Sequence, residues 1–112
     1  MKIDIPSKLS EQDIIELNKE LSKEGIEICG IIDGGSYLVL GAGTNACMFQ
    51  TDIKDHMQIF HTHPEDEPPS PIDLQTMFQL CGKMEIFTPN NKYVVINECK
   101  DSTLIISRQQ KS

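Results

Sequence analysis

The chain has 112 residues, and its ten Lys and Arg against seventeen Asp and Glu give a net charge of −7 and a pI near 4.8. This length suits one domain with one core and is too short for two. An acidic chain lacks the positive face that nucleic-acid binding needs, which argues against such a partner. No apolar run approaches the roughly 18 residues of a membrane span, and residues 1–6 have no apolar signal core. We therefore expect a cytoplasmic protein without a membrane partner, forming a single domain over residues 1–112.

The four cysteines are far apart, lie mostly inside apolar runs and form no C-x-x-C pair. They are Cys29, Cys47, Cys81 and Cys99. The spacings typical of a cysteine zinc site or a disulfide framework are absent. The sequence therefore favours reduced, buried thiols.

The first predicted element is a helix. Ser10 to Asp13 has the pattern of a capping box, apolar residues follow at helical spacing, and Gly25 suits the end of a helix. We expect this helix to cover about residues 11–24.

Strands are predicted next, over residues 26–33 and 37–40, where short apolar and β-branched runs flank Gly34-Gly35, a hairpin signal. Residues 46–49 are a further candidate strand in an otherwise ambiguous stretch. Residues 57–60 form the strand that leads into two histidines.

The second half begins with a helix signal, since Ser70 precedes Pro71 and an apolar side runs on to Gly82. Three strands are predicted after it, over residues 84–88, 92–96 and 103–106, and the polar tail 108–112 is expected to be frayed. The result is a mixed α/β domain.

The most informative feature is a set of metal-binding residue types. His61 and His63 stand two residues apart, so both side chains point to the same side of an extended strand. Asp73 follows a proline-rich loop and would be the third ligand. Two histidines and one carboxylate, with a fourth position for water, form the ligand set of a catalytic zinc rather than a structural one. This pattern predicts one Zn²⁺ per chain and a hydrolase.

Simpler interpretations compete with this one. Ser70 to Asp73 is also a helix-start sequence, in which Ser70 caps the backbone and Asp73 lies near the positive end of the helix dipole. A single histidine is more often a packed or surface residue than a ligand. The three residues together favour the metal site. His56 lies an odd number of residues from both histidines, so it should face the opposite side of the strand and not bind the metal.

These residues resemble the zinc-binding signature of the JAMM (MPN-plus) metalloproteases. That signature is H-x-H, seven residues, then S-x-x-D, with a glutamate on an earlier strand. Residues 61–64 match its first part and residues 70–73 its second, while Glu27 to Ile32 is similar to the glutamate strand. The resemblance spans about residues 24–80. It implies a cytidine-deaminase-like MPN domain, with a central mixed β-sheet flanked by two main helices.

The chain departs from the signature at one point. Six residues, Pro64 to Pro69, separate His63 from Ser70, where the signature has seven. Losing one residue moves a loop end by up to ~3.3 Å, so either the loop takes a tighter path or the ligands are misplaced. The alternative function is therefore a catalytically silent MPN-type scaffold or binding module. We expect an intact site, because all five functional residue types are present, and the short chain is similar to compact prokaryotic or phage-type members.

The resemblance also implies roles for individual residues. His61, His63 and Asp73 would hold Zn²⁺, Glu27 would be the general base and later the general acid, and Ser70 would donate a hydrogen bond to the oxyanion. Glu24 is the competing candidate for the base. The expected activity is that of a zinc-dependent peptidase or isopeptidase, with the tail of a ubiquitin-like or sulfur-carrier protein as a candidate substrate. Residues 41–55 and 64–69 would select that substrate.

Overall fold

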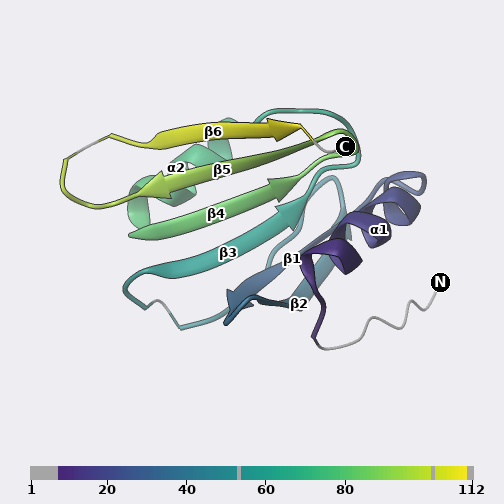
Figure 1. The fold of residues 1–112 in the computed structure, drawn as a ribbon, viewed down its shortest axis with the longest axis horizontal. Coiled ribbons are helices and arrows are strands. Elements are labelled where there is room, and N and C mark those ends of the chain that lie inside the picture. The colour runs from purple at the N-terminus through teal and green to yellow at the C-terminus, as the bar shows by residue number, and fades with distance from the viewer. Residues whose placement is uncertain (1–7, 53, 102, 111–112) are drawn as a thin grey trace.

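The computed structural model describes residues 8–52, 54–101 and 103–110, which form a six-stranded mixed sheet and two helices (Figure 1). The strands lie in the order β2-β1-β3-β4-β5-β6. Only β3 and β4 run parallel, because α2 connects them as a crossover, and the other neighbours are antiparallel. In chain order the elements are α1 (Glu11–Ser22), β1 (Ile26–Asp33), β2 (Ser36–Thr44), β3 (Met57–Thr62), α2 (Pro71–Gln79), β4 (Gly82–Phe87), β5 (Asn91–Asn97) and β6 (Ile105–Gln110). The expected mixed α/β architecture is confirmed.

The predicted first helix is present and begins with its capping box. The Asp13 backbone N–H donates to Ser10 Oγ at 3.1 Å, and the Ser10 N–H donates to Asp13 Oδ2 at 2.9 Å. The helix ends at Ser22, two residues before the expected end. Neither of the two described helices is long and apolar enough to cross a membrane.

The glycine hairpin is also confirmed. Gly34 and Gly35 have φ values of 59° and 83°, in the left-handed region that glycine adopts without strain, and Asp33 pairs with Ser36 across the turn. β2 is longer than predicted, because it pairs with β1 as far as Thr44. Residues 46–49, the candidate strand, are irregular.

The two helices cover opposite faces of the sheet. Phe60 on β3 belongs to the cluster under α1, with Ile14 and Leu21, whereas its neighbour Ile59 belongs to the cluster under α2, with Met77. Successive strand residues point to opposite faces, so the centre of the sheet is buried on both sides.

A buried ionic group lies on the α1 side. Glu85 is only 4% exposed, and it accepts hydrogen bonds from Tyr37 Oη at 2.5 Å and pairs with Lys83 and Lys92 at 3.0 and 3.1 Å. Burial opposes ionisation of Glu85, but these donors outweigh it and hold the pKa of Glu85 below its usual value. This cluster fastens α1 to the sheet, because Glu11 of α1 also pairs with Lys92 at 2.7 Å.

Two expectations about the second half are wrong. α2 ends at Gln79 rather than near Gly82. β6 includes Arg108, Gln109 and Gln110, which were expected to be a frayed tail, and Arg108 pairs with Tyr93 of β5. Every residue of β6 is exposed, so no alternating apolar pattern marks it in the sequence. Residues 111 and 112 of the expected tail lie outside the described residues.

The expectation of reduced thiols is also wrong, because the four cysteines form two disulfides. Cys29 on β1 joins Cys47 in the irregular segment after β2, and Cys81 joins Cys99 in the segment between β5 and β6. Their Cα atoms are 6.0 and 5.5 Å apart, within the range a disulfide requires. Tertiary folding produces this proximity, and the cysteine spacing carries no signal of it.

Replacing Cys81 and Cys99 by serine should lower the free energy of unfolding by about 3 kcal/mol, since the closed loop is of a length for which cross-linking removes that much chain entropy from the unfolded state. Each bond closes a loop of sequence separation 18. Urea denaturation of the non-reduced wild-type and variant proteins measures the difference. An unchanged midpoint would contradict the pairing.

Candidate metal centre

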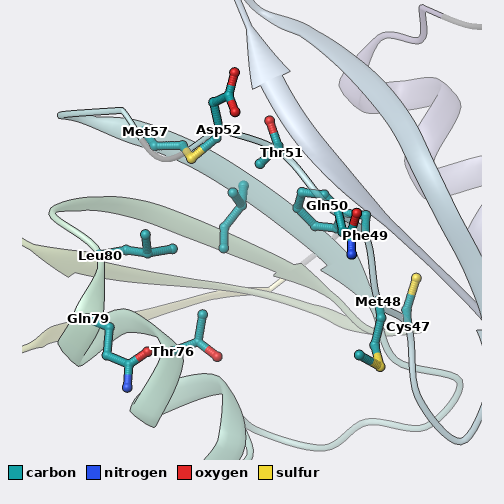
Figure 2. Close-up of a pocket in the computed structure, with 11 residues that line it drawn as sticks. Cys47, Met48, Phe49, Gln50, Thr51, Asp52, Met57, Thr76, Gln79 and Leu80 are labelled. Atoms are coloured by element: carbon teal, nitrogen blue, oxygen red, sulfur yellow. The ribbon is translucent and has the colours of Figure 1, made fainter.

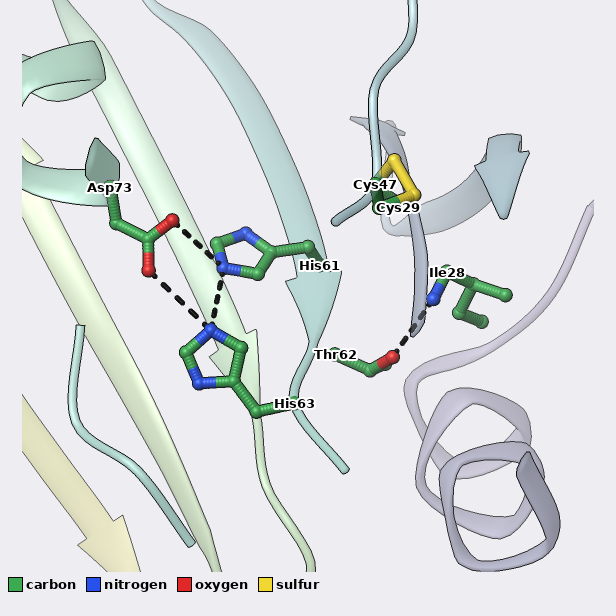
Figure 3. The surroundings of a disulfide bond; sticks show 7 residues. All are labelled: Ile28, Cys29, Cys47, His61, Thr62, His63 and Asp73. Carbon is green, nitrogen blue, oxygen red and sulfur yellow. Dashed lines mark hydrogen bonds and ion pairs between the residues drawn. A yellow bond between two sulfur atoms is a disulfide. The ribbon is translucent and has the colours of Figure 1, made fainter. Parts of the chain in front are cut away.

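Two histidines meet at the carboxyl end of β3. His61 is in the strand, and His63 is the first residue after the strand ends. Both rings lie on the α2 side of the sheet, with their Nε2 atoms 3.1 Å apart (Figure 3). His63 is 7% exposed. The i, i+2 spacing therefore brings the two rings together as expected.

Asp73 reaches both rings from the first turn of α2. Its Oδ1 lies 3.1 Å from His61 Nε2, and its Oδ2 lies 3.5 Å from His63 Nε2. Asp73 is also part of a capping box, because Ser70 N–H donates to its Oδ2 at 2.9 Å and its own N–H donates to Ser70 Oγ at 3.1 Å. The capping and ligand interpretations are thus compatible, and the cap aims the carboxylate at the histidines.

The proton on His63 is placed by its surroundings. Its Nδ1 lies 3.1 Å from the carbonyl oxygen of Glu67, which can only accept, whereas Nε2 lies 3.5 Å from Asp73 Oδ2, so the shorter contact favours Nδ1 as the nitrogen that carries the hydrogen in the neutral ring. The Nε2 lone pair then faces His61 and Asp73. The His63 backbone N–H donates to Phe87 O at 2.8 Å. A carbonyl bonded to the outer nitrogen is the usual partner of a metal-binding histidine.

The spacing of the ligand atoms fits a zinc ion. Bonds of about 2.0–2.1 Å at tetrahedral angles place neighbouring ligand atoms roughly 3.3–3.4 Å apart. His61 Nε2 lies 3.1 Å from His63 Nε2 and 3.1 Å from Asp73 Oδ1, whereas His63 Nε2 is 3.5 Å from the other carboxylate oxygen, Oδ2. One ligand atom from each residue lies within 4.8 Å of the others. These three residues could therefore hold one Zn²⁺ and leave the fourth position to solvent.

The charges of the site agree with this arrangement. Burial opposes ionisation of Asp73, but the contacts of its carboxylate with the His61 and His63 rings and the hydrogen bond from the Ser70 backbone outweigh it and hold the pKa of Asp73 well below its usual range. Burial also lowers the pKa of His63, but Asp73, the Glu67 carbonyl and the charge of Glu27 raise it overall. Asp73 is thus ionised, and the raised pKa of His63 means that this site favours positive charge, as a bound metal cation would supply.

Glu27 is near the site but outside the group of ligands. It is half-buried on β1, the strand whose Cys29 pairs with His61, and its charge acts on His63. The Ile28 N–H donates to Thr62 Oγ1 at 3.0 Å and keeps β1 beside β3 at this end (Figure 3). Glu24, the competing candidate, is exposed in the turn before β1.

The six-residue loop contains a tight turn, as one of the two expected outcomes requires. Within it the Glu67 N–H donates to Glu65 O at 2.8 Å, closing a three-residue turn. This turn shortens the route of the chain from His63 to Ser70. His56 is exposed in the turn before β3, with φ at 58°, rather than in the strand as expected, and it is not part of the ligand group found among the described residues.

A groove lies on the same side of the sheet as the three proposed ligands. It is a cavity of about 820 Å³ between the irregular segment 47–52 and α2 (Figure 2). Its floor includes Ile59, two residues before His61, and its wall includes Thr76, three residues after Asp73. Residues two apart on a strand, or three apart on a helix, point to the same side, so the groove lies on the same face of the sheet as His61, His63 and Asp73, although none of these three residues lines it. The Cys29–Cys47 disulfide fastens its other wall to β1.

Replacing Ser70 by alanine should leave the zinc content unchanged. It should lower turnover roughly 10²–10³-fold, as the loss of an oxyanion donor does. It should also lower the free energy of unfolding by about 1 kcal/mol, as the loss of a helix cap does. The Ser70 hydroxyl accepts from Asp73 N, so its hydrogen can still be donated. Ser10→Ala is the matched control, because Ser10 caps α1 in the same way. If both variants lose only stability, Ser70 is a cap and nothing more. The measurements are kcat, zinc stoichiometry and thermal unfolding.

No protein-family model, curated protein or solved structure matches this chain.

Proposed function

We propose that this chain is a zinc-dependent peptidase or isopeptidase of the JAMM type, built on a cytidine-deaminase-like MPN domain. The convergence of His61, His63 and Asp73 on one point carries this proposal. The charge that Glu27 exerts on His63 and the capping of α2 by Ser70 support it.

The chemistry follows from these side chains. Bound Zn²⁺ supplies a water molecule whose pKa is lowered toward about 7. Glu27, which is not a ligand, accepts the proton of the attacking water and later delivers it to the leaving amine. Ser70 donates its hydroxyl hydrogen to the oxygen of the scissile carbonyl as negative charge develops there.

The groove suggests the kind of substrate. Its lining combines Met48, Phe49, Ile59 and Leu80 with amide and hydroxyl side chains, and Asp52 is the only charged residue among the described residues that line it. Such a lining suits an extended protein segment with an apolar side chain next to the scissile amide. The tail of a ubiquitin-like or sulfur-carrier protein is the candidate.

The test is zinc content together with hydrolysis of a panel of ubiquitin-like and sulfur-carrier protein fusions. We expect close to one equivalent of zinc, and cleavage that a chelator abolishes and added zinc restores. A folded protein that takes up no zinc would overturn the proposal in favour of the silent scaffold.

The two disulfides bear on the proposed cytoplasmic location. Such bonds are rare where glutathione and thioredoxin keep thiols reduced, so a protein that acts in the cytoplasm should have free thiols there. Labelling the free thiols of the protein with a maleimide in native extracts shows whether its cysteines are reduced or disulfide-bonded. Four labelled thiols place the working protein in a reducing compartment, and none places it in an oxidising one.

A further inference from the structure

The loop between the metal ligands is fastened at its centre by Asp66. Its carboxylate accepts a hydrogen bond from Thr88 Oγ1 at 2.7 Å, one from the backbone N–H of Asn90 at 2.7 Å, and one from the Asn90 side-chain amide. All three donors belong to the turn between β4 and β5. Thr88 is fully buried at 0% exposure, so this anchor is attached to the core of the domain rather than to a surface segment.

The same turn connects to His63 by two routes. Phe87, directly before Thr88, accepts the His63 backbone N–H at 2.8 Å. Glu67, directly after Asp66, accepts the His63 ring Nδ1–H at 3.1 Å. The backbone of His63 is thus held by Phe87 and its ring by Glu67, and the hydrogen bonds of Asp66 connect these two segments.

The direction of the Glu67 carbonyl depends on its two neighbours. Pro68 follows Glu67, and a residue before proline is restricted to extended conformations. Asp66 precedes it and is held by three hydrogen bonds. With both sides fixed, the carbonyl has little freedom to turn away from the ring.

We propose that Asp66 is a positioning residue for the metal centre, which holds the Glu67 carbonyl against His63 so that the hydrogen stays on Nδ1 and Nε2 is free to bind the metal. This inference rests on the proposed zinc site. It also explains how a loop of six residues can connect His63 to Ser70. Because Asp66 fixes the conformation of the loop, a seventh residue is not needed.

Two variants of Asp66 test this role, with one control elsewhere. Asp66→Ala removes all three acceptor contacts, whereas Asp66→Asn keeps an oxygen for Thr88 and for the Asn90 backbone. Asp13→Ala is the control, because Asp13 is a structural carboxylate on α1 without a route to His63.

The first readout is zinc affinity by competition with a chelator. We expect Asp66→Ala to bind zinc roughly 10- to 100-fold more weakly, as for lost outer partners of a metal-binding histidine. Asp66→Asn should recover most of that loss, and Asp13→Ala should match the wild type even if its melting temperature falls. Wild-type affinity in Asp66→Ala would overturn the proposal.

The second readout does not need zinc. Long-range ¹H–¹⁵N spectra of the metal-free protein, recorded above the pKa of the ring, report which nitrogen of His63 carries the hydrogen. The wild type should have the Nδ1–H form, and Asp66→Ala should show a mixture of both forms. If the wild type binds no zinc, the proposed function fails, and these spectra still decide the role of Asp66: an unchanged Nδ1–H signal in the variant contradicts it.

Discussion

Glu27→Gln should retain zinc while its turnover falls by roughly 10²–10⁴-fold, the contribution of a positioned acid/base group. Glutamine is nearly isosteric with glutamate but cannot accept the proton at neutral pH. Glu27 lies outside the group formed by His61, His63 and Asp73, so its change leaves the ligands intact. The measurement is kcat/KM on an amide substrate, together with zinc stoichiometry.

The control for this change is Glu24→Gln, three residues earlier. Glu24 is exposed in the turn before β1 and should be replaceable without effect. If Glu24→Gln loses activity and Glu27→Gln does not, the glutamate strand has been assigned the wrong residue. If neither variant is affected, the proton transfer assigned to Glu27 does not take place.

Removing a metal ligand should have a different signature, in which zinc and activity are lost together. His63→Ala and Asp73→Asn each leave two of the three protein ligands. A zinc site with three protein ligands needs all of them to hold the ion. Zinc content of the purified proteins and chelator competition measure the loss.

Both ligand variants have matched controls in the chain. Asp13→Asn changes the corresponding capping-box carboxylate of α1, and His56→Ala removes a histidine close to the site in sequence. We expect both controls to bind zinc as the wild type does. Loss of zinc in His56→Ala would show that the wrong histidines were chosen, whereas full zinc in Asp73→Asn would remove the carboxylate from the ligand set.

Local signals explain what the sequence predicted well. Ser10 and Gly34-Gly35 act on the backbone within a few residues, so the start of α1 and the first hairpin follow from chemistry next to them in the chain. The meeting of His61 with His63 is equally local, because strand geometry alone sets it.

Other features depend on contacts between distant residues and could not be predicted. A strand was predicted over residues 103–106, but β6 continues through the polar, exposed residues up to Gln110, because β5 offers them a pairing edge. Cys29 and Cys47 are brought together by the return of the chain after β2. Likewise, Asp66 has nothing in its own sequence neighbourhood that marks it, since its partners lie in the turn after β4.

The local pattern also left one alternative on which the structure bears. From the sequence alone, Ser70 and Asp73 could form only a helix cap, because a sequence pattern does not reveal the direction in which a carboxylate points. In the folded chain the cap and the histidines share the same carboxylate.

X-ray absorption at the zinc edge of the loaded protein tests the central claim most directly. We predict a first shell of two imidazole nitrogens with oxygen from Asp73 and water, at about 2.0–2.2 Å, and no sulfur. The shell should lose one nitrogen in His61→Ala, if that variant retains any zinc. A shell containing sulfur from Cys29 or Cys47, or a wild-type shell that changes when His56 is replaced, would contradict the assignment of His61, His63 and Asp73 as the zinc ligands.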